Sequence, residues 1–242
     1  MPAPGSPSDS EHSGGDPSAL NAVVLGATGA VGGCLVQALL QSPHIGKVTT
    51  LGRRPLELDG FPSGRLVHRV VDVFEPAAYE THLAGHQAAF CTLGVGQPSK
   101  VTPEELYRVD VECAFRFASA CRRKGVSHFT LMTAVGASST SRTRYLRYKA
   151  GIEDKVRVLG FRRASFFRPS MLLTPANRYG LVQAVMLRLF PFIDPLLAGP
   201  LASLRSITVE ALGRAMALNA GQPGSGAEIL QWRDFQRILG RN

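Results

Sequence analysis

Residues 20–32 read LNAVVLGATGAVG, a short apolar run that is followed directly by three glycines in GxxGxxG spacing. An apolar run of this length is typical of a strand that is buried on both faces of a parallel sheet. Gly26 permits a tight strand-to-helix turn, Gly29 lets backbone approach a pyrophosphate, and Gly32 lets the helix pack closely on the strand. The N–H groups at the start of that helix would then face a negative charge. The stretch predicts a dinucleotide site, with a glycine-rich turn without a ligand as the alternative; its expected contact residues are Gly26, Thr28, Gly29, Ala30, Val31 and Gly32.

Strand-like and helix-like segments alternate along the rest of the chain. Such alternation builds βαβ units, which form a parallel sheet with right-handed crossovers. We therefore expect an α/β fold: a Rossmann-like, doubly wound parallel sheet with helices on both faces and a small C-terminal substrate or lid region. The expected strands are 21–25, 47–52, 66–71, 88–93, 127–133 and 164–168, the expected helices are 30–41, 103–124 and 144–159, and a mixed tail follows.

The 242 residues suffice for one domain with a sizeable core. Residues 1–19 are mostly Pro, Gly, Ser and Asp and predict a disordered tail, while 20–242 form a single NAD(P)-binding domain whose portion from about 170 onward makes the substrate side. Segment 181–201 is the most apolar part, but it is interrupted by Arg188, Pro191, Asp194 and Pro195, so it does not predict a membrane span. A pocket lid or additional core helices are favoured there, with a peripheral membrane or protein contact as the alternative.

The chain carries a formal charge of +9, and its first 20 residues hold three acidic and no basic side chains, so the remainder carries +12. A basic body favours an anionic cofactor or substrate. The basic residues are scattered and no zinc-ligand spacing or aromatic RNA-binding strand is present, so we expect neither nucleic-acid binding nor a metal site. The cysteines lack CxxC spacing and lie in apolar segments, which predicts buried free thiols in a reducing compartment; they are Cys34, Cys91, Cys113 and Cys121. The N-terminus has no signal-peptide pattern, so a cytoplasmic location is expected.

The second expected strand ends in Arg53-Arg54, where a site for NAD(H) usually has an acidic residue that contacts the adenosine ribose. Guanidinium groups bind phosphate in bidentate geometry, so the pair predicts NADP(H) rather than NAD(H). A solvated loop is the alternative. Asp72, beside Val73, would take the adenine amino group after the third strand. The fourth strand closes on further contact residues, Thr92, Leu93 and Gly94.

Tyr145 and Lys149 lie four residues apart on an expected helix and therefore share a face. An ammonium group beside a phenol stabilises the phenolate, so the phenol can exchange a proton with a carbonyl or alcohol oxygen. Lys149 would also hold the nicotinamide ribose. Thr133, at the end of the preceding strand, could donate to or accept from the substrate oxygen. Tyr148 is a competing phenol without the spacing, and a surface role for the Tyr145–Lys149 pair is the alternative.

The chain resembles atypical short-chain dehydrogenases/reductases, in particular the Tat-interacting-protein oxidoreductase group. The resemblance covers nearly everything after residue 20 and is carried by GATGAVG at 26–32, TLGRR at 50–54, VVD at 70–72, FCTLG at 90–94, ELYRVD at 105–110, HFTLMTAVGAS at 128–138, YLRYK at 145–149 and SFFRPSMLL at 165–173. It implies a Rossmann fold, bound NADP(H), and a Ser/Thr-Tyr-Lys set at Thr133, Tyr145 and Lys149. It also implies that Pro169 lines the nicotinamide.

The sequence departs from the group's pattern at two positions. Thr133-Ala134 stands where a serine is usual, so the hydroxyl comes from Thr133, comes from Ser138 or Ser139, or is missing. Asp110 stands where members of the wider superfamily often have a proton-relay Asn, which puts that relay in doubt.

The leading functional prediction is an NADPH-dependent oxidoreductase that reduces a carbonyl or oxidises an alcohol on a small molecule. Three arginines crowd the tyrosine and could favour an anionic substrate, although a solvated helix face is the simpler interpretation; they are Arg142, Arg144 and Arg147. A non-catalytic NADP(H) sensor or scaffold that acts through a protein partner is the main alternative. An accessory protein that uses 181–201 at a membrane or in an assembly is another. A monomer or a homodimer fits each of these predictions.

Overall fold

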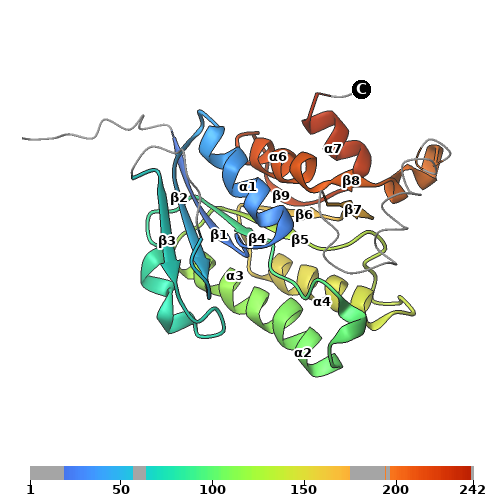
Figure 1. Ribbon diagram of the computed structural model, residues 1–242, viewed down its shortest axis with the longest axis horizontal. Helices are drawn as coiled ribbons and strands as arrows, with labels where there is room; N and C mark the ends of the chain where they lie inside the picture. Colours follow the sequence, from blue (N-terminus) through green and yellow to red (C-terminus); the bar gives the residue numbers. More distant parts are fainter. Residues whose placement is uncertain (1–18, 57–63, 175–193, 195–196, 241–242) are drawn as a thin grey trace, which may run out of the picture.

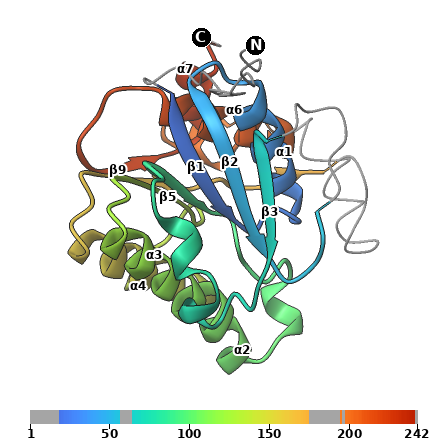
Figure 2. The ribbon, with the colours of Figure 1, turned by 90° about the vertical axis from the view of Figure 1, so that its left-hand side faces the viewer.

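The computed structural model describes residues 19–56, 64–174, 194 and 197–240. Among them, parallel strands build a seven-stranded sheet in the order β3-β2-β1-β4-β5-β6-β9. All strands of this sheet run in the same direction (Figures 1 and 2). Strands β2 and β3 are added outward on one side of β1, and β4 and the later strands are added on its other side, so the order of the strands reverses between β1 and β4. This is the expected doubly wound Rossmann sheet. Its strands are β1 (Leu20–Leu25), β2 (Ile45–Gly52), β3 (Leu66–Val70), β4 (Ala88–Cys91), β5 (His128–Met132), β6 (Arg163–Phe167) and β9 (Gly226–Leu230).

Helices cover both faces of the sheet, as expected (Figure 1). One face carries α1 (Ala30–Gln41), α6 (Val209–Ala220) and α7 (Trp232–Ile238), and the other carries α3 (Ala114–Arg123) and α4 (Arg144–Val158). Each layer encloses its own apolar core against the sheet. At the crossing of α1 and α6, a Cβ on Gly213 would lie 2.7 Å from the backbone nitrogen of Leu35, so only glycine allows this close approach.

The expected helix 103–124 is interrupted by a π-helical segment. It begins as α2 (Pro103–Tyr107), widens over Arg108–Cys113 and continues as α3. The expected N-cap is confirmed, because the Thr102 side chain accepts a hydrogen bond from the Glu105 backbone N–H at 3.2 Å. Widened turns of this kind are frequent at functional sites. The segment contains Asp110, whose side chain is buried.

The C-terminal part contains elements that the sequence patterns did not predict. A small second sheet pairs β7 (Leu172–Leu173) with β8 (Ile207–Thr208). After β8 the chain forms α6, β9 and α7, which complete the main sheet and one of its helix layers. Short 3-10 helices are η1 (Pro76–Ala78), η2 (Glu80–Leu83), η3 (Pro98–Lys100) and η6 (Gly199–Leu204).

Two predictions lie wholly or largely outside the described residues: the tail 1–19, apart from Ala19, and segment 181–201, apart from 194 and 197–201. No helix in the described ranges is long and apolar enough to cross a membrane. None of the four cysteines forms a disulfide, as expected, but Cys34 is partly exposed while the other three are buried. Burial raises the pKa of the Cys91 thiol to about 11, so this thiol stays protonated at neutral pH.

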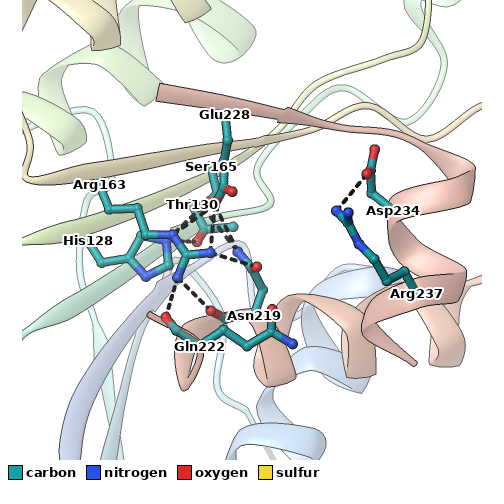
Figure 3. A network of polar contacts seen from close by, with 9 residues as sticks. All are labelled: His128, Thr130, Arg163, Ser165, Asn219, Gln222, Glu228, Asp234 and Arg237. Atoms are coloured by element: carbon teal, nitrogen blue, oxygen red, sulfur yellow. Dashed lines mark hydrogen bonds and ion pairs between the residues drawn. The ribbon is translucent and has the colours of Figure 1, made fainter. Parts of the chain in front are cut away.

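A buried polar network lies at the amino ends of β5, β6 and β9 (Figure 3). At its centre, Arg163 contacts the Glu228 carboxylate at 2.7 Å and donates to Asn219 Oδ1 at 2.8 Å. Ser165 Oγ donates to Glu228 at 2.5 Å and lies 2.8 Å from His128 Nε2. These contacts tie β9 and the end of α6 to the middle of the sheet, at the edge opposite to the glycine turn.

Acidification is expected to destabilise the protein through His128. Burial, together with the positive charge of Arg163, lowers the pKa of His128 from 6.5 to about 4. Between about pH 4 and pH 6.5, His128 binds a proton in the unfolded chain but not in the folded chain. The free energy of unfolding is therefore unaffected by this group above pH 6.5 and decreases as the pH falls below that value. The free energy of unfolding should drop by roughly 3 kcal/mol by about pH 4. Urea unfolding across this range measures the drop, and an equally steep drop in His128→Gln would assign it to other groups.

Candidate cofactor and active site

The glycine turn joins β1 to α1 at the carboxyl edge of the sheet. Gly26 has a φ of 95°, and a Cβ there would lie 2.7 Å from the Leu93 backbone nitrogen. A Cβ on Gly32 would lie 2.1 Å from the Gly26 carbonyl oxygen, so turn and helix touch backbone to backbone. The Thr92 hydroxyl donates to the same carbonyl at 3.2 Å, which binds the turn to the end of β4. Four of the residues expected to contact the cofactor therefore lie together: Gly26, Gly32, Thr92 and Leu93.

The start of α1 is suited to bind an anion. Its N-cap residue, Gly29, is exposed and supplies no side-chain cap, and no acidic residue lies in the first turn. The first N–H groups of a helix have no partner within the helix and carry a partial positive charge. A diphosphate group fits this arrangement, because the N-cap residue itself places no side chain on these donors.

A pocket of about 560 Å³ opens beside the ends of β2 and β3, and it is lined by Arg53, Val70, Val71, Asp72, Phe74 and Arg108. The Arg108 guanidinium lies 4.3 Å from the centre of the Phe74 ring, and that of Arg53 lies 5.7 Å from it. Asp72 accepts a hydrogen bond from the Phe74 backbone N–H at 2.9 Å, which shapes the pocket floor. Two guanidinium groups therefore converge here.

Two residues that were expected to bind the cofactor near this pocket, Arg54 and Val73, do not line it. Arg54 is exposed and does not line the pocket; its carbonyl oxygen lies 2.9 Å from His68 Nε2. Val73 is buried in the core, and its carbonyl accepts from the Cys113 thiol at 3.1 Å. Arg108 was missed by sequence reasoning because it comes from the widened helical turn, 55 residues after Arg53.

Tyr145 and Lys149 face one another across one turn of α4. The Lys149 ammonium lies 5.5 Å from the centre of the Tyr145 ring and forms a 2.6 Å ion pair with Asp110 Oδ1. The other Asp110 oxygen accepts from the Val95 backbone N–H at 3.0 Å. Burial alone would lower the pKa of Lys149, but its interactions with the Tyr145 side chain and the Asp110 carboxylate outweigh burial and hold this pKa above its usual range. Lys149 is therefore an ammonium at neutral pH.

The end of β4 approaches this ion pair closely. A Cβ on Gly94 would lie 3.3 Å from Asp110 Oδ1 and 3.8 Å from Lys149 Nζ. Gly94 follows Thr92 and Leu93, which contact the glycine turn. The loop after β4 thus connects the helix terminus that can bind phosphate with the Tyr145–Lys149 pair.

Thr133 lies at the end of β5, and its hydroxyl donates to Glu153 Oε1 at 2.7 Å. Glu153 is fully buried on α4 and also receives two hydrogen bonds from Arg168, at 2.8 and 2.5 Å. Pro169 follows Arg168 directly, and its carbonyl accepts from the Val135 N–H at 2.9 Å. The expected residues Thr133 and Pro169 therefore lie near the same edge, but Thr133 is engaged by a carboxylate that the sequence analysis did not single out.

The remaining candidates around Tyr145 make local contacts. Ser138 Oγ lies 2.9 Å from Thr140 Oγ1, and Arg147 donates to the carbonyl of Ser141 at 2.7 Å. Tyr148 packs edge-on against Tyr107 with ring centres 5.2 Å apart, so the second phenol is directed toward α2. Ser139, Arg142 and Arg144 are exposed.

A family model described as NAD(P)H-binding matches residues 26–168, from the first glycine of the turn to the arginine beside Glu153. The chain belongs to this NAD(P)H-binding family. It is 32% identical to protein HTATIP2 of Rattus norvegicus over 209 residues, 86% of this chain and 84% of that protein. It is also 32% identical to the mitochondrial protein fmp52 of Aspergillus clavatus over 155 residues, 63% of this chain and 66% of that protein. The resemblance to the Tat-interacting-protein group is confirmed.

Solved structures share the fold at low sequence identity. MoeE5 in complex with UDP-glucuronic acid and NAD superposes with a TM-score of 0.67 at 18% identity, covering 91% of this chain and 82% of that chain. An ADP-L-glycero-D-manno-heptose-6-epimerase of Helicobacter pylori gives 0.65 at 12% identity, with 92% and 81% covered. These likenesses confirm the Rossmann fold of the family member. The cytoplasmic location stays a prediction, and the name of the fungal relative places that protein in mitochondria.

Proposed function

We propose that the protein is an NADP(H)-dependent oxidoreductase that reduces a carbonyl group, or oxidises an alcohol, on a small molecule. The observation that carries the proposal is the buried Lys149–Asp110 ion pair, which lies beside the Tyr145 ring and against Gly94 of the cofactor edge. A buried ion pair costs desolvation free energy, and perturbed ionisable groups of this kind cluster at functional sites. NADPH, when bound, supplies the hydride.

Each residue of the pair has a defined task in this proposal. Tyr145 gives its phenolic proton to the substrate oxygen, or takes one from an alcohol in the reverse direction. Lys149, held as an ammonium by Asp110, stabilises the phenolate that remains. Asp110 fixes the direction of the Lys149 side chain and binds the Val95 backbone, so it also positions the loop after β4.

The preference for NADP(H) is supported by the pocket at the ends of β2 and β3. Arg53 and Arg108 converge there with no carboxylate partner among the contacts described, and the pocket has room for a phosphate. Guanidinium groups recognise phosphate through paired, charge-assisted hydrogen bonds. The Phe74 ring and the exposed Val70 supply an apolar wall for a purine.

We expect the Arg53→Ala and Arg108→Ala variants to lose affinity for NADPH but not for NADH. Removing one charged hydrogen-bonding partner of the 2′-phosphate should raise the dissociation constant for NADPH by about 10- to 100-fold. NADH lacks that phosphate, so its affinity should change by less than about twofold. Titration calorimetry with both cofactors measures the difference.

Arg162→Ala is the matched control, since Arg162 is exposed and lies next to β6 at the opposite edge of the sheet. Equal losses for NADPH and NADH would contradict the assignment of the 2′-phosphate site. A wild-type protein that binds NADPH but reduces no aldehyde, ketone or quinone in a broad screen would favour the non-catalytic sensor instead.

A further inference from the structure

The Glu153 side chain is the centre of a buried polar cluster that the proposed chemistry does not use. Its carboxylate has no solvent exposure and accepts from the Thr133 hydroxyl and from two nitrogens of Arg168. Arg157, one turn further along α4, contacts it at 3.5 Å. Thr133 directly follows β5 and Arg168 directly follows β6, so the cluster joins α4 to the ends of two neighbouring strands of the sheet.

The hydrogen-bond roles in the cluster decide what Thr133 can do. A hydroxyl group has one proton to donate. Thr133 Oγ1 lies 2.7 Å from the Glu153 carboxylate and 3.5 Å from the Phe167 carbonyl, and neither of these groups can donate a hydrogen bond to it. The proton of Thr133 is therefore committed to the protein. In this arrangement the hydroxyl does not donate to a substrate carbonyl, whereas its lone pairs can still accept a hydrogen bond from a substrate alcohol.

The position of Glu153 on α4 relates the cluster to the proposed active site. Tyr145, Lys149 and Glu153 are spaced four residues apart, so they follow one face of the helix. The N-cap residue Thr143 supplies no side-chain cap, although its carbonyl accepts a hydrogen bond from the Arg147 backbone N–H at 3.2 Å. Among the described residues, the ion pairs Lys149–Asp110 and Glu153–Arg168 thus connect this face of α4 to other elements.

We infer that Glu153 is a positioning residue: it binds Thr133 and Arg168 to set where α4 presents Tyr145 and Lys149 to the cofactor. The inference rests on the proposed function and deepens it. Buried ion pairs seldom stabilise a fold more than apolar packing would, whereas fixing one register between elements is their best-attested role. A shift of about 1 Å in a group that contacts a reacting molecule can cost about 100-fold in rate.

Binding measurements with two ligands test the inference without requiring turnover. NADPH reaches Tyr145 and Lys149 through its nicotinamide ribose, whereas adenosine 2′,5′-bisphosphate carries the 2′-phosphate and lacks the nicotinamide half. We expect Glu153→Gln to weaken NADPH binding by about tenfold and to change binding of the bisphosphate by less than about twofold. An amide retains the oxygen that accepts from Thr133 and from Arg168 Nε, but it turns an N–H group toward Arg168 Nη2, so one of the two contacts with the arginine after β6 is lost.

Asp154→Asn is the matched control: it makes the same carboxylate-to-amide change on the adjacent residue, whose ion pair with Arg157 lies at the surface. It should bind both ligands as the wild type does. Thr133→Val serves if Glu153→Gln fails to fold, since it removes only the hydroxyl; NADPH affinity and kcat should each fall by about two- to fivefold. Thr133→Ser, which restores the hydroxyl, should return both to the wild-type values.

Several outcomes would overturn the inference. Unchanged NADPH binding in Glu153→Gln would remove the positioning role, and equal weakening of both ligands would indicate a general loosening of the fold. A loss of kcat of about 1000-fold in Thr133→Val with intact NADPH binding would return Thr133 to the substrate oxygen. If the wild type binds neither ligand, the proposed function itself fails, and the inference fails with it.

Discussion

Tyr145→Phe is expected to lower kcat for reduction of an accepted carbonyl substrate by about 10²- to 10⁴-fold, the usual contribution of a positioned general acid. The ring is retained, so its packing beside Lys149, with 5.5 Å between the ammonium and the ring centre, should persist. Affinity for NADPH should therefore stay within about twofold of the wild type. Loss of NADPH absorbance measures turnover, and fluorescence on mixing measures binding.

Tyr148→Phe is the matched control for this experiment. Tyr148 lies on the same helix, but its ring packs against Tyr107 instead of Lys149. Its loss of the hydroxyl should leave kcat within about twofold. Turnover that survives in Tyr145→Phe and falls in Tyr148→Phe would exchange the roles of the two phenols, and turnover that survives in both would remove tyrosine from the mechanism.

The second large effect is expected at the glycine turn. Gly32→Ala would bring a methyl group to 2.1 Å from the Gly26 carbonyl oxygen, which no relaxed structure permits. The turn must move, and the backbone donors at the start of α1 move with it. We expect affinity for NADPH to fall by about 100-fold or more, equivalent to about 3 kcal/mol.

Gly33→Ala makes the same chemical change one residue later and is the control. A Cβ at Gly33 would lie 3.6 Å from the Ala27 carbonyl oxygen, which is an ordinary contact. The variant should bind NADPH within about twofold of the wild type and should stabilise α1 slightly, because alanine favours a helix more than glycine does. Equal NADPH affinity in both variants would show that the turn does not hold the cofactor.

The sequence predicted the first half of the fold well because the signals there are local. An apolar run followed directly by Gly26, Gly29 and Gly32 specifies a strand, a turn and a helix within 13 residues. The later strand β9 was missed, since it lies at an edge and most of its residues are exposed or half-exposed. Its pattern is accordingly close to that of a loop.

The sequence predicted several individual residues of the candidate site, but it did not predict the ion pairs and hydrogen bonds between them. The four-residue spacing of Tyr145 and Lys149 is visible in the sequence, whereas the ion pair between Lys149 and Asp110 joins residues 39 apart and depends on the widened helical turn. Glu153 could have been found, because it continues the same spacing by one more step and puts a carboxylate on a helix face that also carries Ala150 and Ile152 in the core. Arg168 gave no such signal, since its partner lies on another element.

The pairing of β7 with β8 has a consequence for how this scaffold can diversify. Leu172 pairs with Ile207, so residues that lie 35 positions apart in the sequence are held side by side. Whatever occupies the interval can be lengthened, shortened or exchanged without altering strand order, and β9 and the helices after it still add to an unchanged frame.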